Sequence, residues 1–254
     1  KTLDSPTFGS EGSANFPTVN VLDPTLTASV ISNGNLQLTE VISNFGARAN
    51  FAVPLTGKWY WEAYVNNGAY QETWAGITGP TTNSSGDGRG GSSNATTYGA
   101  SWSNYSGSNM YIRKYIAGTE SAVSGSFGPT SDTILGVAVN RDDNEAKFYK
   151  NNVLQFTTTI SATQEFFPAG GGGGGTDAGT IGVWNFGQDG TFAGNETAQG
   201  NADGNGYGDF YYAPPTDFLA LCAANLPTAA EVDPAQTDDN YPQELFFMSQ
   251  YTGN

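Results

Sequence analysis

Carboxylates are the only side chains in this sequence with which a hydrolase could work. The chain contains no histidine and one cysteine, Cys222, which excludes Ser-His-Asp and Cys-His catalysis and histidine-ligated zinc. Glu62 is one candidate acid, and Asp142, Asp143 and Glu145 form a cluster of others. A glycosidase needs two carboxyl groups facing each other across a cleft at roughly 5 to 9.5 Å. No paired Glu-x-Asp-x-x-Glu pattern appears, so we expect no enzyme.

The acidic cluster lies between two expected strands, residues 133–139 and 145–149, in the stretch DTILGVAVNRDDNEAKFYKNN. Asp is favoured at such a reversal because its side chain accepts hydrogen bonds from nearby backbone N–H groups. The pattern therefore predicts a β-hairpin whose acids form the turn. Glu62 lies in GKWYWEAYV and alternates with Trp59 and Trp61, which predicts a central strand that carries both tryptophans into a core.

Asp203, Asn205 and Asp209 alternate with glycines in GNADGNGYGDFYY. Oxygen ligands at alternating positions on a flexible backbone are what a calcium loop requires. An EF-hand loop would also need a Glu at its twelfth position, where Pro214 stands here. Two interpretations remain open: a Ca²⁺ site at these three residues, which would be the only cofactor, or an ordinary Gly-rich connection.

Aromatic and cationic residues near a polar stretch form the predicted ligand-binding set. Tyr98, Trp102 and Tyr105 stand among Ser and Asn residues, a combination suited to stacking on sugar rings and bonding hydroxyls. Core packing is the competing interpretation of these rings. Arg89 and Arg113 are scarce cations in an acidic chain and could hold an anionic group, although isolated surface charges usually do nothing specific.

The charge balance excludes some partners. The formal net charge is −15, with nine Lys and Arg residues, so binding to a phosphate backbone would lack its main driving force. We therefore expect no nucleic acid partner.

The sequence also lacks the features of membrane and disulfide-bonded proteins. The apolar run Phe218–Ala224 is too short to cross a bilayer, and no signal segment opens the chain, so we expect no membrane insertion. A single cysteine allows no intrachain disulfide, and we expect Cys222 to be a small core residue.

Composition predicts an all-β chain. Thirty-four glycines and twelve prolines indicate short strands joined by turns. Residues 79–97 are almost free of apolar side chains and predict a long exposed loop. We also expect Gly170–Gly175 to be a flexible loop, and the stretch SWSNYSGSN to present an exposed turn over residues 102–109. Further strands are expected at residues 19–22, 30–31, 35–39, 47–53, 74–78, 98–102, 111–116 and 181–187.

Four segments in order resemble the SPRY family: GKWYWEAYV (57–65), DTILGVAVNRDDNEAKFYKNN (132–152), FFPA (166–169) and WNFGQ (184–188). The resemblance covers roughly residues 19–190. It implies a concanavalin-like bent β-sandwich used for binding, with the ligand contacts on loops. The Gly-rich insertion after Phe167 and the polar loop 79–97 depart from the family pattern.

A second resemblance spans most of the chain. The segments DSPT, SNGNL, NFGQDGTFAG, TAQGNADGNGYGDFYYAPP, FLALCAANLP and YTGN look like SPRY-bearing virion proteins of tailed bacteriophages, especially marine ones. This implies a virion component. We divide the chain into an N-terminal arm (1–18), a SPRY-like sandwich with a C-terminal extension (19–226), and a tail (227–254) whose apolar run LFFM is expected to pack on a neighbour.

Three functions follow from these expectations. The first is a non-catalytic tail-fibre or surface-fibre adhesin on the phage particle, which binds a host surface glycan or protein. We expect this adhesin to form a homo-oligomer and to contact other virion proteins. The second is a capsid decoration or fibre-joint protein with a purely structural role. The third is a concanavalin-like polysaccharide-degrading enzyme that works through Glu62.

Overall fold

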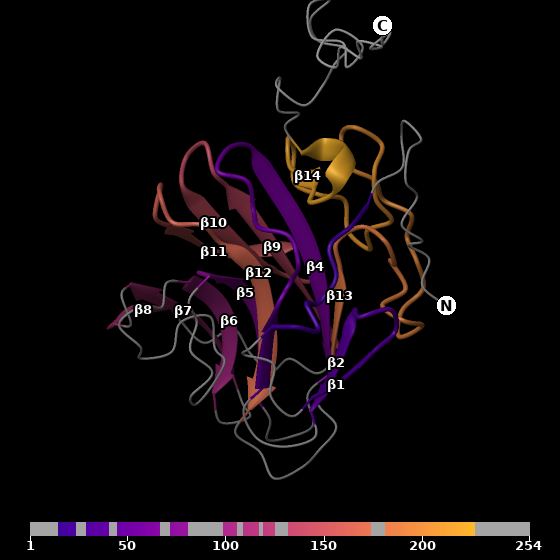
Figure 1. Ribbon diagram of the computed structural model, residues 1–254, viewed down its shortest axis with the longest axis horizontal. Coiled ribbons are helices and arrows are strands. Elements are labelled where there is room, and N and C mark those ends of the chain that lie inside the picture. Colours follow the sequence, from indigo (N-terminus) through magenta and orange to yellow (C-terminus); the bar gives the residue numbers. More distant parts are fainter. Residues whose placement is uncertain are drawn as a thin grey trace, which may run out of the picture.

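The computed structural model describes residues 15–23, 29–40, 45–66, 72–80, 99–105, 109–116, 119–124, 132–173 and 181–226. Within these ranges the chain forms two antiparallel sheets packed face to face, with one short 3-10 helix, Ala223–Asn225 (Figure 1). The predicted fold class, an all-β concanavalin-like sandwich, is confirmed. No helix in the described part of the chain is long and apolar enough to cross a membrane.

The first sheet has the strand order β1-β2-β13-β4-β9-β10-β11, and β14 pairs with β4 in parallel. Its strands are β1 (Ser29–Ser32), β2 (Gln37–Glu40), β4 (Lys58–Asn66), β9 (Thr133–Asn140), β10 (Glu145–Lys150), β11 (Val153–Thr159), β13 (Ile181–Asn185) and β14 (Leu219–Ala220).

The second sheet has the order β3-β12-β5-β6-β7-β8. Its strands are β3 (Phe45–Arg48), β5 (Glu72–Thr78), β6 (Gly99–Tyr105), β7 (Asn109–Ile116), β8 (Thr119–Ser124) and β12 (Phe167–Gly173).

Strand β4 lies in the middle of the first sheet, as its two tryptophans predicted. Trp59, Trp61, Ala63 and Val65 enter the core between the sheets, where Leu135, Val137 and Phe148 of the neighbouring strands meet them. The other face of β4 is buried as well, since Tyr60, Glu62 and Tyr64 are all below 5% exposed. A strand that is buried on both faces needs a second layer of cover outside the sheet.

That cover is the segment that follows β13, residues 186–226, here called the extension. Figure 1 shows it on the side of β4 and β13 that faces away from the second sheet. Phe210 and Phe218 pack with Tyr60 and Cys222 in one apolar cluster, and Phe192 packs with Tyr64 in another. The core position expected for Cys222 is confirmed, and the thiol is free and fully buried.

The predicted hairpin is confirmed as β9 and β10 joined by the turn 141–144. The side-chain oxygen of Asn140 accepts the backbone N–H groups of Asp142 and Asp143, both at 3.1 Å. Asp142 accepts the N–H of Gly57 at 2.7 Å, and Asp143 accepts the Asn140 amide at 2.7 Å. Both carboxylates therefore form the turn, as the pattern indicated.

The expected flexible loop at Gly170–Gly175 is wrong for its first four residues. Gly170 to Gly173 lie in β12, paired with β5 on one side and largely with β3 on the other. Close packing explains this, because a Cβ on Gly170 would lie 2.3 Å from Cζ2 of Trp184. Gly170 lets the Trp184 ring approach the backbone. Gly174 and Gly175 lie outside the described residues.

Candidate functional site

Glu62 is the most deeply buried carboxylate that the sequence singled out, with an exposed fraction of 0%. Four donors surround it. Oε1 accepts the N–H of Tyr212 at 2.8 Å and the hydroxyl of Tyr60 at 3.1 Å. Oε2 accepts the N–H of Tyr211 at 2.9 Å and the Asn185 amide at 3.3 Å. The carboxylate thus joins β4 to β13 and to the extension.

The electrostatics of Glu62 follow from this burial. Loss of hydration disfavours the charged form, and the four hydrogen bonds favour it. Desolvation is the larger effect and raises the pKa of Glu62 to about 7. The same burial, with the Glu62 carboxylate alongside, raises the pKa of the Tyr60 hydroxyl. No face of Glu62 reaches solvent, and its hydrogen bonds to Tyr211 and Tyr212 hold the extension on the sheet.

Asp203 plays a similar structural part within the extension. Its Oδ1 accepts the N–H groups of Asn205 and Tyr207, both at 2.9 Å. Its Oδ2 accepts the N–H of Ala220 at 2.8 Å and the Asn225 amide at 2.7 Å. These bonds occupy both carboxylate oxygens and tie the Gly-rich loop to the strand β14 and the 3-10 helix.

The other two predicted calcium ligands, Asn205 and Asp209, have different hydrogen-bond partners from each other. Asn205 is exposed and bonds to Asn225 at 2.8 Å, while Asp209 accepts the N–H of Gly190 at 3.4 Å. Among the described residues, no three acidic or cysteine side chains gather where they could hold a metal ion. Calcium binding by Asp203, Asn205 and Asp209 stays a prediction, and the hydrogen bonds of Asp203 favour the alternative of a structural connection.

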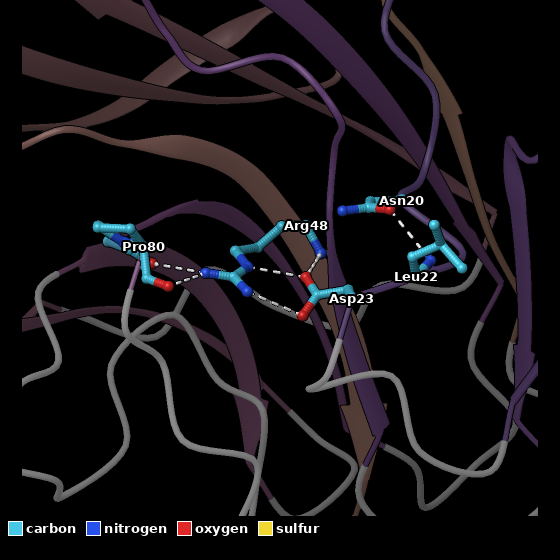
Figure 2. A network of polar contacts seen from close by, with 6 residues as sticks. Asn20, Leu22, Asp23, Arg48 and Pro80 are labelled. Carbon is cyan, nitrogen blue, oxygen red and sulfur yellow. Dashed lines mark hydrogen bonds and ion pairs between the residues drawn. The ribbon is translucent and has the colours of Figure 1, made fainter.

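The second polar cluster centres on Arg48 at the end of β3 (Figure 2). Its Nε donates to Oδ2 of Asp23 at 2.7 Å and its Nη2 donates to Oδ1 at 2.9 Å, a bidentate ion pair. Its Nη1 donates to the carbonyls of Gly79 and Pro80, and the guanidinium lies 5.8 Å from the centre of the Phe167 ring. Arg48 therefore joins the segment before β1 to the segment that follows β5.

Residues 20–23 form a tight turn against this arginine, and we call the turn together with Arg48 the Arg48 corner. The backbone N–H of Asn20 donates to the Arg48 carbonyl at 2.8 Å, and Asp23 N–H closes the turn on the Asn20 carbonyl at 3.0 Å. The Asn20 side chain accepts the N–H of Leu22 at 3.0 Å. The backbone of the turn is thus fixed at both ends.

The Arg48 corner presents apolar side chains to solvent. Leu22 is 85% exposed and Val21 is 49% exposed, although hydrophobic residues are unusual at the middle of a tight turn. The strand predicted for residues 19–22 is wrong, because Val19 makes only a single bridge to Ala49 and the chain then turns. The side chains of Asn20 and Asp23 favour the turn by accepting local backbone N–H groups.

The structure describes the backbone of only three of the five predicted ligand-binding residues, so this set stays a prediction. Tyr98 and Arg89 lie outside the described residues. Trp102 and Tyr105 lie in β6 rather than in the exposed turn predicted from residue 102 onward, and Arg113 lies in β7; their side chains are outside the description. By register, Trp102 pairs with Ala75 and Ile112, both core residues.

Strand register also divides the three predicted binding loops between the two ends of the second sheet. The strands that flank residues 81–98 end at Thr78 and Gly99, which pair with each other. The strands before residues 106–108 and 174–180 end at Tyr105 and Gly173, near the opposite end of β5, where Glu72 pairs with Gly173. One shared patch made from all three loops is therefore not what the topology favours.

Comparison with known proteins gave matches among solved structures. No family model matches the chain, and no curated protein matches it. The crystal structure of the TRIM65 PSpry domain is similar at 14% identity and a TM-score of 0.47, covering 67% of this chain and 92% of that one. The SPRY domain of human HERC1 is similar at 18% identity and a TM-score of 0.45, covering 62% of this chain and 92% of that one.

Sequence reasoning missed the Arg48 corner. The signal that could have found it is the spacing of Asn20 and Asp23, two residues that favour turns and flank the apolar pair Val21 and Leu22. Arg48 is one of only nine basic residues, yet it sits in a strand. Nothing in the spacing of residues 23 and 48 shows that they meet, because that contact depends on the bridge between Val19 and Ala49.

Proposed function

We propose that this chain is a non-catalytic binding domain of a tailed bacteriophage virion, a tail-fibre or surface-fibre adhesin that contacts a host surface glycan or protein. The resemblance of residues 185–194, 197–215 and 218–227 to phage virion proteins supports the virion setting. In this proposal the chain is homo-oligomeric and its other partners are virion proteins.

The observation that carries the binding proposal is the exposure of Leu22 on a turn fixed by the Arg48–Asp23 ion pair. Exposed apolar side chains on a backbone that is already ordered bind at a low entropic cost, because little freedom is lost on association. Arg48 also connects the turn to Pro80, which precedes the polar residues 81–98 (Figure 2). We therefore place the ligand contact at this end of the sandwich.

The binding test compares Leu22→Ser with Leu55→Ser. Leu55 is 57% exposed and lies in the segment before β4, so it controls for a lost surface leucine. Each protein is applied to cells of a susceptible bacterial strain and to a glycan array. We expect Leu22→Ser to lower binding at least fivefold and Leu55→Ser to leave it unchanged. Equal binding by both variants and the unaltered chain would remove the Arg48 corner from the proposal, and no binding at all would end the adhesin hypothesis.

The second candidate function is that of a capsid decoration or fibre-joint protein, which the apolar run LFFM in the tail favours. Its affinity would lie in the arm and the tail rather than in the Arg48 corner. Deletion of residues 227–254 would then abolish incorporation into particles, while Leu22→Ser particles would stay infective.

The third candidate, an enzyme that degrades polysaccharide through Glu62, is opposed by the complete burial and four hydrogen bonds of that carboxylate. Release of reducing ends from host polysaccharide that disappears in Glu62→Gln would favour the enzyme. We expect no such release from the unaltered chain.

A further inference from the structure

Among the described strands, β11 is the last strand at one edge of the first sheet. It pairs with β10 on one side, and no other described strand pairs with it. At its far end Thr159 accepts a hydrogen bond from Lys114 Nζ at 3.0 Å, and the Val153 carbonyl accepts one from the Gln155 side chain at 2.9 Å. Between these points, residues 154–157 pair with β10 and make no hydrogen bond to any other described strand.

This edge lacks two of the features that normally prevent strand addition, namely charge and proline. Natural sheet edges are kept short or carry charges, proline or a bulge that turns them away. β11 is seven residues long, VLQFTTT, with no charge and no proline. A bulge opposite Phe148 and Tyr149 interrupts its pairing with β10, and on this strand Val153 is 61% exposed and Leu154 is 49% exposed. By contrast β1 and β3, also at sheet ends, have four residues each. An uncharged edge strand with two exposed apolar side chains offers a surface that a further strand could cover.

The chain carries one segment that fits this edge. Residues 227–254 contain a single run of consecutive large apolar residues, Leu245–Met248, preceded by Glu244. Phe and other large apolar residues favour strands, and an added strand gains main-chain hydrogen bonds along the whole edge. Residues 227–254 also hold five acids and no base, and β11 carries no acid that would repel them.

The chain between the extension and the apolar run is long enough for Leu245–Met248 to reach β11. Eighteen residues separate Leu226 at the end of the extension from Leu245, which can span about 60 Å when extended. A domain of about 200 residues has a radius of gyration of only about 16 Å. A flexible connection of this length gives a local concentration in the millimolar range, so the edge meets its own tail before it meets another molecule at micromolar concentration.

We propose that residues Glu244–Ser249 add to the open edge of β11 in the same chain as a further strand of the first sheet, with the run Leu245–Met248 covering Val153 and Leu154. The tail then protects an edge that would otherwise recruit a second sheet. This inference concerns the sandwich alone and holds whether or not the chain is an adhesin.

A cross-linking experiment on the full chain tests it. The double variant Leu154→Cys, Phe247→Cys is treated with a short bismaleimide. The control is Leu22→Cys, Phe247→Cys. Leu22 is more exposed than Leu154 but lies in the turn 20–23 rather than in β11. The native Cys222 is fully buried. We expect the first pair to link within one chain at least tenfold faster than the control. Equal rates would overturn the proposal, and links only between chains would overturn it in favour of a second copy.

Hydrogen exchange provides a second measurement that needs no cysteine. In the unaltered chain we expect the amides of residues 245–249 and of β11 to be protected together. In Phe246→Asp, Phe247→Asp both should lose at least tenfold protection, while β4 and β9 should not change. Unprotected amides at 245–249 in the unaltered chain, or unchanged β11 protection in the variant, would contradict the proposal.

Discussion

Glu62 accepts a hydrogen bond of 2.8 Å from the backbone N–H of Tyr212, so a residue at the centre of the first sheet holds the extension 150 positions further along the chain. Tyr211 N–H binds the other oxygen at 2.9 Å. The contact replaces water on a carboxylate that would otherwise lie on the outer face of the sheet. It also makes the attachment of the extension sensitive to the protonation of one group.

The first prediction concerns pH. An unfolded Glu loses its proton near 4.5, while the buried Glu62 keeps it until about pH 7. Between these values the folded chain binds more protons than the unfolded chain, so the free energy of unfolding falls as pH rises. The contribution of Glu62 is fully present below about pH 4.5 and is lost by about pH 8, a change of roughly 3 kcal/mol.

The matched variant for this prediction is Glu62→Gln, which cannot titrate. Denaturant unfolding of both proteins at pH 4.5, 6 and 8 measures their difference in free energy. That difference should shift by roughly 3 kcal/mol across the series in favour of the variant at high pH. A constant difference would show that Glu62 titrates alike in the folded and unfolded chains.

The second prediction concerns the close contact between β12 and Trp184. In Gly170→Ala the added Cβ would lie 2.3 Å from the Trp184 ring, so the ring or the strand must move. Overpacking of this kind costs about 1 to 3 kcal/mol, and sometimes more. Gly182→Ala in β13 is the control, because nothing lies within 4 Å of its Cβ position. Thermal unfolding should separate the two variants clearly, and equal melting temperatures would contradict the packing argument.

The third prediction concerns the Arg48–Asp23 pair. Asp23 is buried, and Arg48→Ala removes both ion-pair hydrogen bonds to its carboxylate. Loss of one member of a buried pair costs about 3 to 5 kcal/mol. Lys58→Ala is the control, since the ion pair of Lys58 with Asp217 spans 3.5 Å at the surface and should contribute less than about 1 kcal/mol. Unfolding free energies that fall equally in both variants would show that Arg48 acts only as a surface charge.

The fourth prediction links that pair to binding. Arg48→Lys keeps the charge but cannot form the bidentate contact with Asp23, so the turn 20–23 becomes less ordered while Leu22 remains. We expect the variant to bind susceptible cells several-fold more weakly than the unaltered chain at a temperature where both are folded. Unchanged binding would mean that the order of the turn does not matter to the ligand.

The sandwich was predictable from the sequence because its strands show local patterns of alternating core and non-core residues. Trp59, Trp61, Ala63 and Val65 alternate along β4, and the acids after Asn140 mark the turn of the hairpin. Gly170 to Gly173 were misassigned because consecutive glycines indicate flexibility unless a partner such as Trp184 is known to approach them. The second buried face of β4 was also hidden, since Tyr60 and Tyr64 suit either solvent or an aromatic cover.

The candidate site was less predictable than the fold, because its residues are brought together by contacts between segments that are distant in the sequence. Aromatic residues near a polar stretch drew attention to Trp102 and Tyr105, but position in the chain does not reveal register. Arg48 contacts Asp23 and Pro80, and these residues meet only after β3, β5 and β12 have paired. Contacts of this kind depend on the assembled sheet and leave no local pattern.

Location of the chain on a virion tests the central proposal most directly. Virions from a phage that carries this chain would be labelled with antibody against residues 15–226 and viewed by negative-stain electron microscopy. Label at the outer end of tail or surface fibres is the result that the adhesin proposal predicts. Label spread over the capsid surface, or no label on intact particles, would contradict it.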